Sequence, residues 1–129
     1  MRKILSMTAL SVAALALAQS IEVTSGKFQG SPMVNGRASI VERDGKRSVD
    51  FKWNKSPGNS LTFRLVKKET IKTGSFPSDA EYIDLGKSPK SVVMSKQLDV
   101  WLYRTIAAVD MKNQIVAYVL LRSAQEAGR

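Results

Sequence analysis

Basic side chains interleaved with aromatic ones between residues 43 and 72 are the feature of this sequence closest to binding chemistry. Cations contact phosphate groups, and Phe51, Trp53 and Phe63 are of a type that stacks on nucleic-acid bases. Alternation along a strand, however, sends these aromatic rings to the face opposite most of the cations. We therefore predict an aromatic core and a solvated basic surface for an anionic partner, such as phospholipid, polysaccharide or an acidic protein. This predicted basic surface comprises Arg43, Lys46, Arg47, Lys52, Arg64, Lys67 and Lys68.

Three acidic residues near Tyr82 are the second candidate for chemistry. Asp79, Glu81 and Asp84 carry the oxygen ligands that calcium prefers. Their spacing matches no calcium-binding loop, and nothing marks two of them as facing each other across a cleft, as a glycosidase requires. We predict that Asp79 and Glu81 are loop surface and that the chain holds no metal.

The chain contains neither cysteine nor histidine. This absence excludes haem ligation by histidine, zinc sites built on these residues, Ser-His-Asp triads and cysteine nucleophiles. We predict a protein that is not an enzyme and has no cofactor of its own. Trp101 and Tyr103, two residues apart, fit core packing, with an aromatic binding surface as the alternative.

The elements that must position these residues have strand patterns. Val49, Phe51 and Trp53 alternate with polar residues, which is typical of a half-buried strand. Asp44-Gly45 predicts a two-residue hairpin in front of that strand. Together with the alternation from Leu61 to Leu65, these signals predict three consecutive antiparallel strands over residues 37–66.

The stretch from Leu98 to Leu121 is the densest apolar block after the N-terminus. Thr105 to Asp110 and Gln114 to Leu121 predict a final strand pair that completes the core. Residues 67–78 are polar and predict a loop, followed by a short strand at 82–86. Many short strands separated by turn signals indicate an all-β fold, a small antiparallel β-sandwich or flattened barrel, with residues 19–129 as its single domain.

The first 18 residues have the pattern of a secretory signal peptide. Arg2 and Lys3 precede an apolar run of residues 4–17, and Ala16-Leu17-Ala18 resembles a cleavage site. The run is shorter than the ~20 residues that span a bilayer. We therefore predict a periplasmic or secreted protein with no transmembrane anchor after cleavage. Export also makes nucleic acid an unsuitable partner. Cleavage removes only two of the 20 cations and none of the 11 acids, so the remaining chain stays basic.

Short motifs spread over most of the chain resemble the DM13 family. They comprise residues 25–28 (SGKF), 34–40 (VNGRASI), 51–53 (FKW), 61–65 (LTFRL), 82–87 (YIDLGK) and 99–106 (DVWLYRTI). The resemblance implies a small extracellular β-sandwich with a role in envelope or matrix attachment or in electron-transfer assemblies. The chain departs from the family in two places. It has no cysteine near Asp110, and it reads Pro57-Gly58 where the family has Gly-Pro.

Three functions follow from these patterns as hypotheses. The first is a non-catalytic cell-envelope or extracellular module that binds an envelope protein or an anionic surface. The second is an auxiliary component of an extracytoplasmic electron-transfer complex, which the missing cysteine argues against. The third is a small-ligand carrier. Its interior would be lined by Phe51, Trp53, Phe63 and Trp101.

Overall fold

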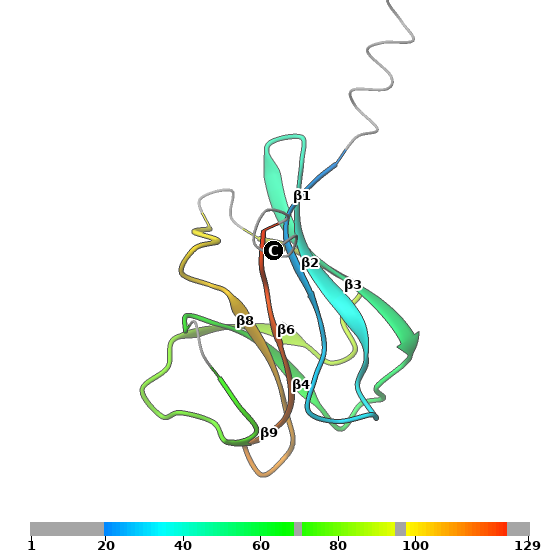
Figure 1. Cartoon of the computed structure of the whole chain (residues 1–129), viewed down its shortest axis with the longest axis vertical. Coiled ribbons are helices and arrows are strands. Elements are labelled where there is room, and N and C mark those ends of the chain that lie inside the picture. Colours follow the sequence, from blue (N-terminus) through cyan, green and yellow to red (C-terminus); the bar gives the residue numbers. More distant parts are fainter. Residues whose placement is uncertain (1–19, 69–70, 95–97, 124–129) are drawn as a thin grey trace, which may run out of the picture.

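Two antiparallel β-sheets make up the described part of the chain (Figure 1). The computed structural model describes residues 20–68, 71–94 and 98–123, and no helix occurs in these ranges. The predicted signal peptide lies outside them. The strands are β1 (Ile21–Lys27), β2 (Asn35–Arg43), β3 (Lys46–Lys55), β4 (Thr62–Val66), β5 (Gly74–Ser75), β6 (Tyr82–Gly86), β7 (Ser91–Met94), β8 (Thr105–Val109) and β9 (Gln114–Leu120).

Sheet A has the strand order β1-β2-β3-β7, and sheet B has the order β5-β9-β8-β4-β6. This arrangement confirms the predicted all-β fold. Of the two predicted architectures, it is a β-sandwich and not a flattened barrel. The Asp44-Gly45 hairpin is also confirmed, with both residues at positive φ. One prediction is wrong, because β4 does not continue the β2–β3 hairpin. It pairs with β8 and β6, so the turn after Lys55 carries the chain from sheet A to sheet B.

The core lies between the two sheets. Ile40 and Val49 of sheet A and Phe63 and Leu65 of sheet B are fully buried and belong to one cluster. The final strand pair is confirmed as β8 and β9, and β8 is the central strand of sheet B with every residue buried. Burial on both faces explains why this stretch is a continuous apolar run rather than an alternating one.

Four aromatic rings form a cluster in the core between the sheets. Phe28, Phe51, Trp53 and Phe63 contact one another with ring centroids 5.2–6.4 Å apart. Such pairs favour offset or edge-to-face packing, as seen here. Trp101 is not part of this group, because 57% of its surface is exposed. The predicted core packing of Trp101 is therefore wrong, and so is its place among the residues that line the proposed carrier interior.

The outward faces of the two sheets differ. On sheet B, the segment after β4 packs Phe76 against Val66, Ala107 and Ile115, which forms a second buried cluster. The polar loop predicted for residues 67–78 thus also supplies a core side chain and the short strand β5. Sheet A has no comparable apolar cluster on its outer side among the described residues. Val41 and Val93 lie on that face beside Ser48, and the rest of the face is mostly polar. No described helix is long and apolar enough to cross a membrane.

Strand β1 touches sheet B as well as sheet A. Ser25 and Arg122 form an isolated antiparallel bridge, which brings β1 against the end of β9. A Cβ atom at Gly26 would collide with the Leu120 carbonyl oxygen and the Val119 side chain. Glycine is therefore required at this position for the two sheets to meet.

Candidate functional site

The predicted basic surface does not form one surface. Three of its residues, Arg43, Lys46 and Lys52, lie on the outward face of sheet A. Lys46 and Lys52 occupy the positions of β3 that alternate with the buried Val49 and Phe51, and Arg43 is paired with Lys46 across the hairpin. The other four residues lie elsewhere. Arg47 is at the end of the β2–β3 hairpin on the inward side, while Arg64, Lys67 and Lys68 belong to β4 and the segment after it.

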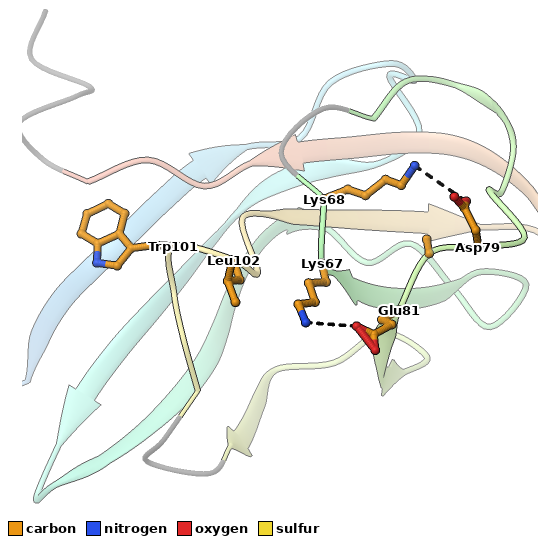
Figure 2. A pocket seen from close by; sticks show the side chains of 7 residues that line it. Lys67, Lys68, Asp79, Glu81, Trp101 and Leu102 are labelled. Carbon is orange, nitrogen blue, oxygen red and sulfur yellow. Dashed lines mark hydrogen bonds and ion pairs between the residues drawn. The ribbon is translucent and has the colours of Figure 1, made fainter.

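Lys67 and Lys68 line an open pocket of about 450 Å³ at one end of sheet B. Figure 2 shows each lysine directed at a carboxylate. Lys67 Nζ lies 3.1 Å from Glu81 Oε1, and Lys68 Nζ lies 3.8 Å from Asp79 Oδ1. The charges in this pocket are balanced in pairs. It therefore offers no net attraction for an anion.

The Lys67–Glu81 pair affects the protonation of the lysine. The hydrogen bond to Glu81, followed by the charge of that carboxylate, raises the pKa of Lys67 above its ordinary value. Both side chains are largely exposed, so solvent screens the interaction. Lys67 stays protonated at neutral pH. It is thus a cation whose partner in the fold is Glu81.

A hydrogen-bonded turn presents two apolar side chains at the rim of this pocket. Asp99 Oδ1 accepts a hydrogen bond of 2.9 Å from the Trp101 N–H, and the Asp99 carbonyl accepts another of 3.1 Å from Leu102. Trp101 and Leu102 are exposed, whereas the preceding Val100 is buried and anchors the turn to the core. In Figure 2 the indole ring points away from both ion pairs. The pocket is therefore lined by two neutralised ion pairs and by the exposed Trp101 and Leu102.

Arg64 is held inside the fold. Its Cζ lies 4.6 Å from the centroid of the Phe76 ring and 4.5 Å from that of Tyr82. Nη1 donates a hydrogen bond of 3.0 Å to Asn113 Oδ1. A guanidinium stacked on two rings with a polar partner fastens the outer segment to sheet B. These contacts engage the half-buried Arg64 side chain within the fold.

Arg47 is also engaged within the fold. Its Nε lies 3.3 Å from Glu42 Oε1, and its Nη1 donates a hydrogen bond to the Leu98 carbonyl oxygen. The second bond ties the β2–β3 hairpin to the turn that begins at Leu98. Arg47 therefore joins two loops rather than contributing to a binding surface.

A row of three cations crosses the outward face of sheet A. Lys27 of β1 is directly opposite Arg37 of β2, and Arg37 is directly opposite Lys52 of β3. Opposed residues in antiparallel strands project to the same face with Cβ atoms about 5 Å apart. All three side chains are exposed, and none has an ion pair or side-chain hydrogen bond within the described ranges. We call Lys27, Arg37 and Lys52 the cation row.

Short hydroxyl side chains lie beside the cation row. The next register positions on the same face are Ser25, Ser39, Asp50 and Ser91, in order from β1 to β7. Asp50 Oδ1 accepts hydrogen bonds of 3.0 Å from Ser48 and 2.7 Å from Ser91. Its charge is therefore satisfied on the β7 side, while the hydroxyls of Ser25 and Ser39 have no side-chain partner among the described residues.

Sequence reasoning included Lys52 and missed Lys27 and Arg37. A signal for Arg37 was present. A two-residue hairpin turn at Asp44-Gly45 fixes every pair in the hairpin, and counting outward from it places Arg37 opposite Lys52. Lys27 has no such signal. Its partner depends on the β1–β2 register, which contains an irregularity between Glu22 and Thr24.

The acidic residues near Tyr82 do not converge. Asp79 and Glu81 face Lys68 and Lys67, and Asp84 Oδ1 accepts a hydrogen bond of 2.9 Å from the Gly86 N–H. No group of three or more potential metal ligands occurs in the part of the chain that the structure describes. Each acid has a structural partner of its own.

Comparisons with family models, with curated proteins and with solved structures found no match to this chain. The resemblance to the DM13 family therefore stays a prediction. The cation row, whose geometry follows from strand register alone, is the candidate functional site.

Proposed function

We propose that this chain is an exported, non-catalytic attachment domain that binds an anionic partner through the outward face of sheet A. The single observation that carries the proposal is the cation row. Like charges directly opposite each other destabilise a sheet. Lys27, Arg37 and Lys52 are stacked in this way with no acid paired to them in the described ranges. Binding of an anion relieves that repulsion.

The surroundings of the row support binding rather than catalysis. The side chains next to it are serines and an aspartate with satisfied hydrogen bonds, together with the Asn35–Asn54 amide pair at 2.8 Å on the other side. These groups donate and accept hydrogen bonds but supply no activated nucleophile. Arg43 and Lys46 lie on the same face but at its hairpin end, away from the cation row and outside the proposed contact. The face therefore suits an extended anionic surface in the envelope or outside the cell.

Ion-exchange chromatography tests the role of the row. The triple variant Lys27→Gln/Arg37→Gln/Lys52→Gln is compared with a control of equal charge change, Lys67→Gln/Lys68→Gln/Lys112→Gln. On a sulfonate resin, we expect the row variant to elute at clearly lower salt than the control, because close contacts with one anionic surface weaken with ionic strength. Equal elution of the two variants would show that only net charge matters and would overturn the proposal.

Export is tested separately. The full chain is expressed with its N-terminus intact, and protein recovered outside the cytoplasm is sequenced from its N-terminus. We expect the mature protein to begin at Gln19, directly after Ala18. Retention of Met1 on protein that stays in the cytoplasm contradicts the exported location.

A further inference from the structure

We propose that the partner of the cation row is a linear polyanion that lies across the strands of sheet A, over β1, β2 and β3. This inference rests on the proposed function and specifies its ligand. A suitable polymer carries sulfate, phosphate or carboxylate groups along one chain. It follows the direction of the row and not the direction of the strands.

The direction follows from the register. Neighbouring strands are about 4.8 Å apart, so the three cations form a line about 10 Å long that is perpendicular to the strands. One small anion reaches one or two of these side chains. A polymer with repeated charges contacts all three, and each further contact forms at a high effective concentration. The cation row is therefore expected to bind a polyanionic polymer more tightly than a single anionic group.

The rows on either side of the cations are suited to a polar chain. Ser25 and Ser39 are short, so a polymer approaches the sheet closely along them, and their hydroxyls donate hydrogen bonds to its oxygens. Asn35 and Asn54 lie on the other side of the row. Polar groups thus flank the charges along both edges.

The same surroundings argue against a lipid bilayer as the partner. Peripheral membrane binding combines cations with apolar side chains that enter the interface. None of the large exposed hydrophobic residues lies in the cation row or in the register positions on either side of it. They are Ile21, Met33, Tyr82, Val93, Trp101, Leu102 and Met111. At the cation row the electrostatic attraction is present without an apolar anchor, since Val93, which is on the same face, lies two register positions away.

Calorimetric titration of the full chain with heparin-derived sulfated oligosaccharides tests the inference. We expect a tetrasaccharide to bind at least about tenfold more tightly than a sulfated monosaccharide, because one further charged contact is worth about tenfold in affinity. Lys27→Gln and Lys52→Gln, at the two ends of the row, are each expected to weaken tetrasaccharide binding by about tenfold. Equal affinity for the two sugars would overturn the linear polymer.

Arg43→Gln is the matched control for the direction in which the polymer crosses sheet A. Arg43 is on the same strand and the same face as Arg37, but it is six residues away, about 20 Å along the strand. We expect this variant to bind the tetrasaccharide within about twofold of the parent chain. A loss as large as that of Lys27→Gln would show that the polymer runs along the strands, which contradicts the proposed path.

Vesicles of phosphatidylglycerol separate this inference from the proposed function. We expect oligosaccharide binding in the calorimeter and weak sedimentation with vesicles. Row-dependent binding to vesicles without binding to the oligosaccharides would overturn the polymer and leave anionic attachment standing. Failure to bind either probe would overturn both.

Discussion

The two basic regions of this molecule differ in whether their cations have partners inside the fold. At the end of sheet B, Lys67 and Lys68 each face a carboxylate. On the outward face of sheet A, Lys27, Arg37 and Lys52 face one another. In sequence, Lys52, Lys67 and Lys68 all belong to the basic stretch of residues 43–72. In the structure one is neutralised by pairing and the other is a concentrated positive charge.

This difference separates cations that form ion pairs within the fold from cations that are available to a binding partner. A paired surface cation contributes modestly to stability and has little field left for a ligand. A cation opposed by other cations costs stability, so the fold gives no reason for its presence. The outward faces of the sheets repeat the contrast. Phe76 and its neighbours cover sheet B, while sheet A is left open and basic.

Removing the largest fully buried side chain should affect both regions equally, because both depend on the same sandwich. Phe63 is fully buried and contacts the rings of Phe28, Phe51 and Trp53. We expect Phe63→Ala to lower the free energy of unfolding by about 3–5 kcal/mol, from lost burial and the cavity left behind. Chemical denaturation followed by tryptophan fluorescence measures the change.

Met111→Ala is the control for that substitution. Met111 is 91% exposed, and its truncation is expected to change the free energy of unfolding by no more than about 0.5 kcal/mol. A loss for Phe63→Ala as small as this would contradict a core shared by the two sheets.

Much of the fold was predictable from the sequence, because it depends on local signals. The Asp44-Gly45 turn and the alternation of Val49 and Phe51 specify the β2–β3 hairpin, and apolarity specifies β8 and β9. The assignment of β4 to sheet B was not predictable in this way. A turn of several residues permits either a hairpin or a crossing between sheets, and only packing of Phe63 against both sheets decides.

The candidate site was predictable only in part. Density of charge along the chain drew attention to residues 43–72, but charge density says nothing about pairing. Lys67 and Arg64 are not part of the candidate site, because they contact residues distant in sequence, Glu81 and Asn113 respectively. Lys27 joined the site through the β1–β2 register. Sequence separation, and not residue type, was the obstacle in both cases.

Reversing one charge in the row sharpens the comparison, because it gives sheet A the pairing that the end of sheet B already has. Arg37→Glu places an acid between Lys27 and Lys52. We expect it to raise the free energy of unfolding by about 0.2–1 kcal/mol, since opposite charges across strands are stabilising. The same variant should lose binding to sulfated oligosaccharides. Thermal unfolding and calorimetric titration give the two results.

Salt dependence controls this prediction. The gain in stability should shrink at 1 M salt, where the screening length falls to about 3 Å. Arg37→Gln should lie between the parent and Arg37→Glu in both measurements. A decrease in stability for Arg37→Glu at low salt would mean that the row is not a site of repulsion, and the argument from unpaired charge would fail.

The smallest expected effect lies in the paired region, where removal of the Glu81 carboxylate should return the pKa of Lys67 to its ordinary value. NMR titration of the Lys67 side chain in the parent protein should give a pKa above the usual ~10.4 for lysine. Glu81→Gln should lower that pKa, whereas Asp79→Asn, which removes the partner of Lys68, should leave it in place. Because the pKa of Lys67 is raised in the folded state, its contribution to stability is fully present below the unfolded pKa. The contribution is lost as the pH rises through the folded pKa, in the strongly alkaline range. A pKa of Lys67 that does not respond to Glu81→Gln would mean that the pair does not persist in solution, and the distinction between paired and unpaired cations would then rest on the cation row alone.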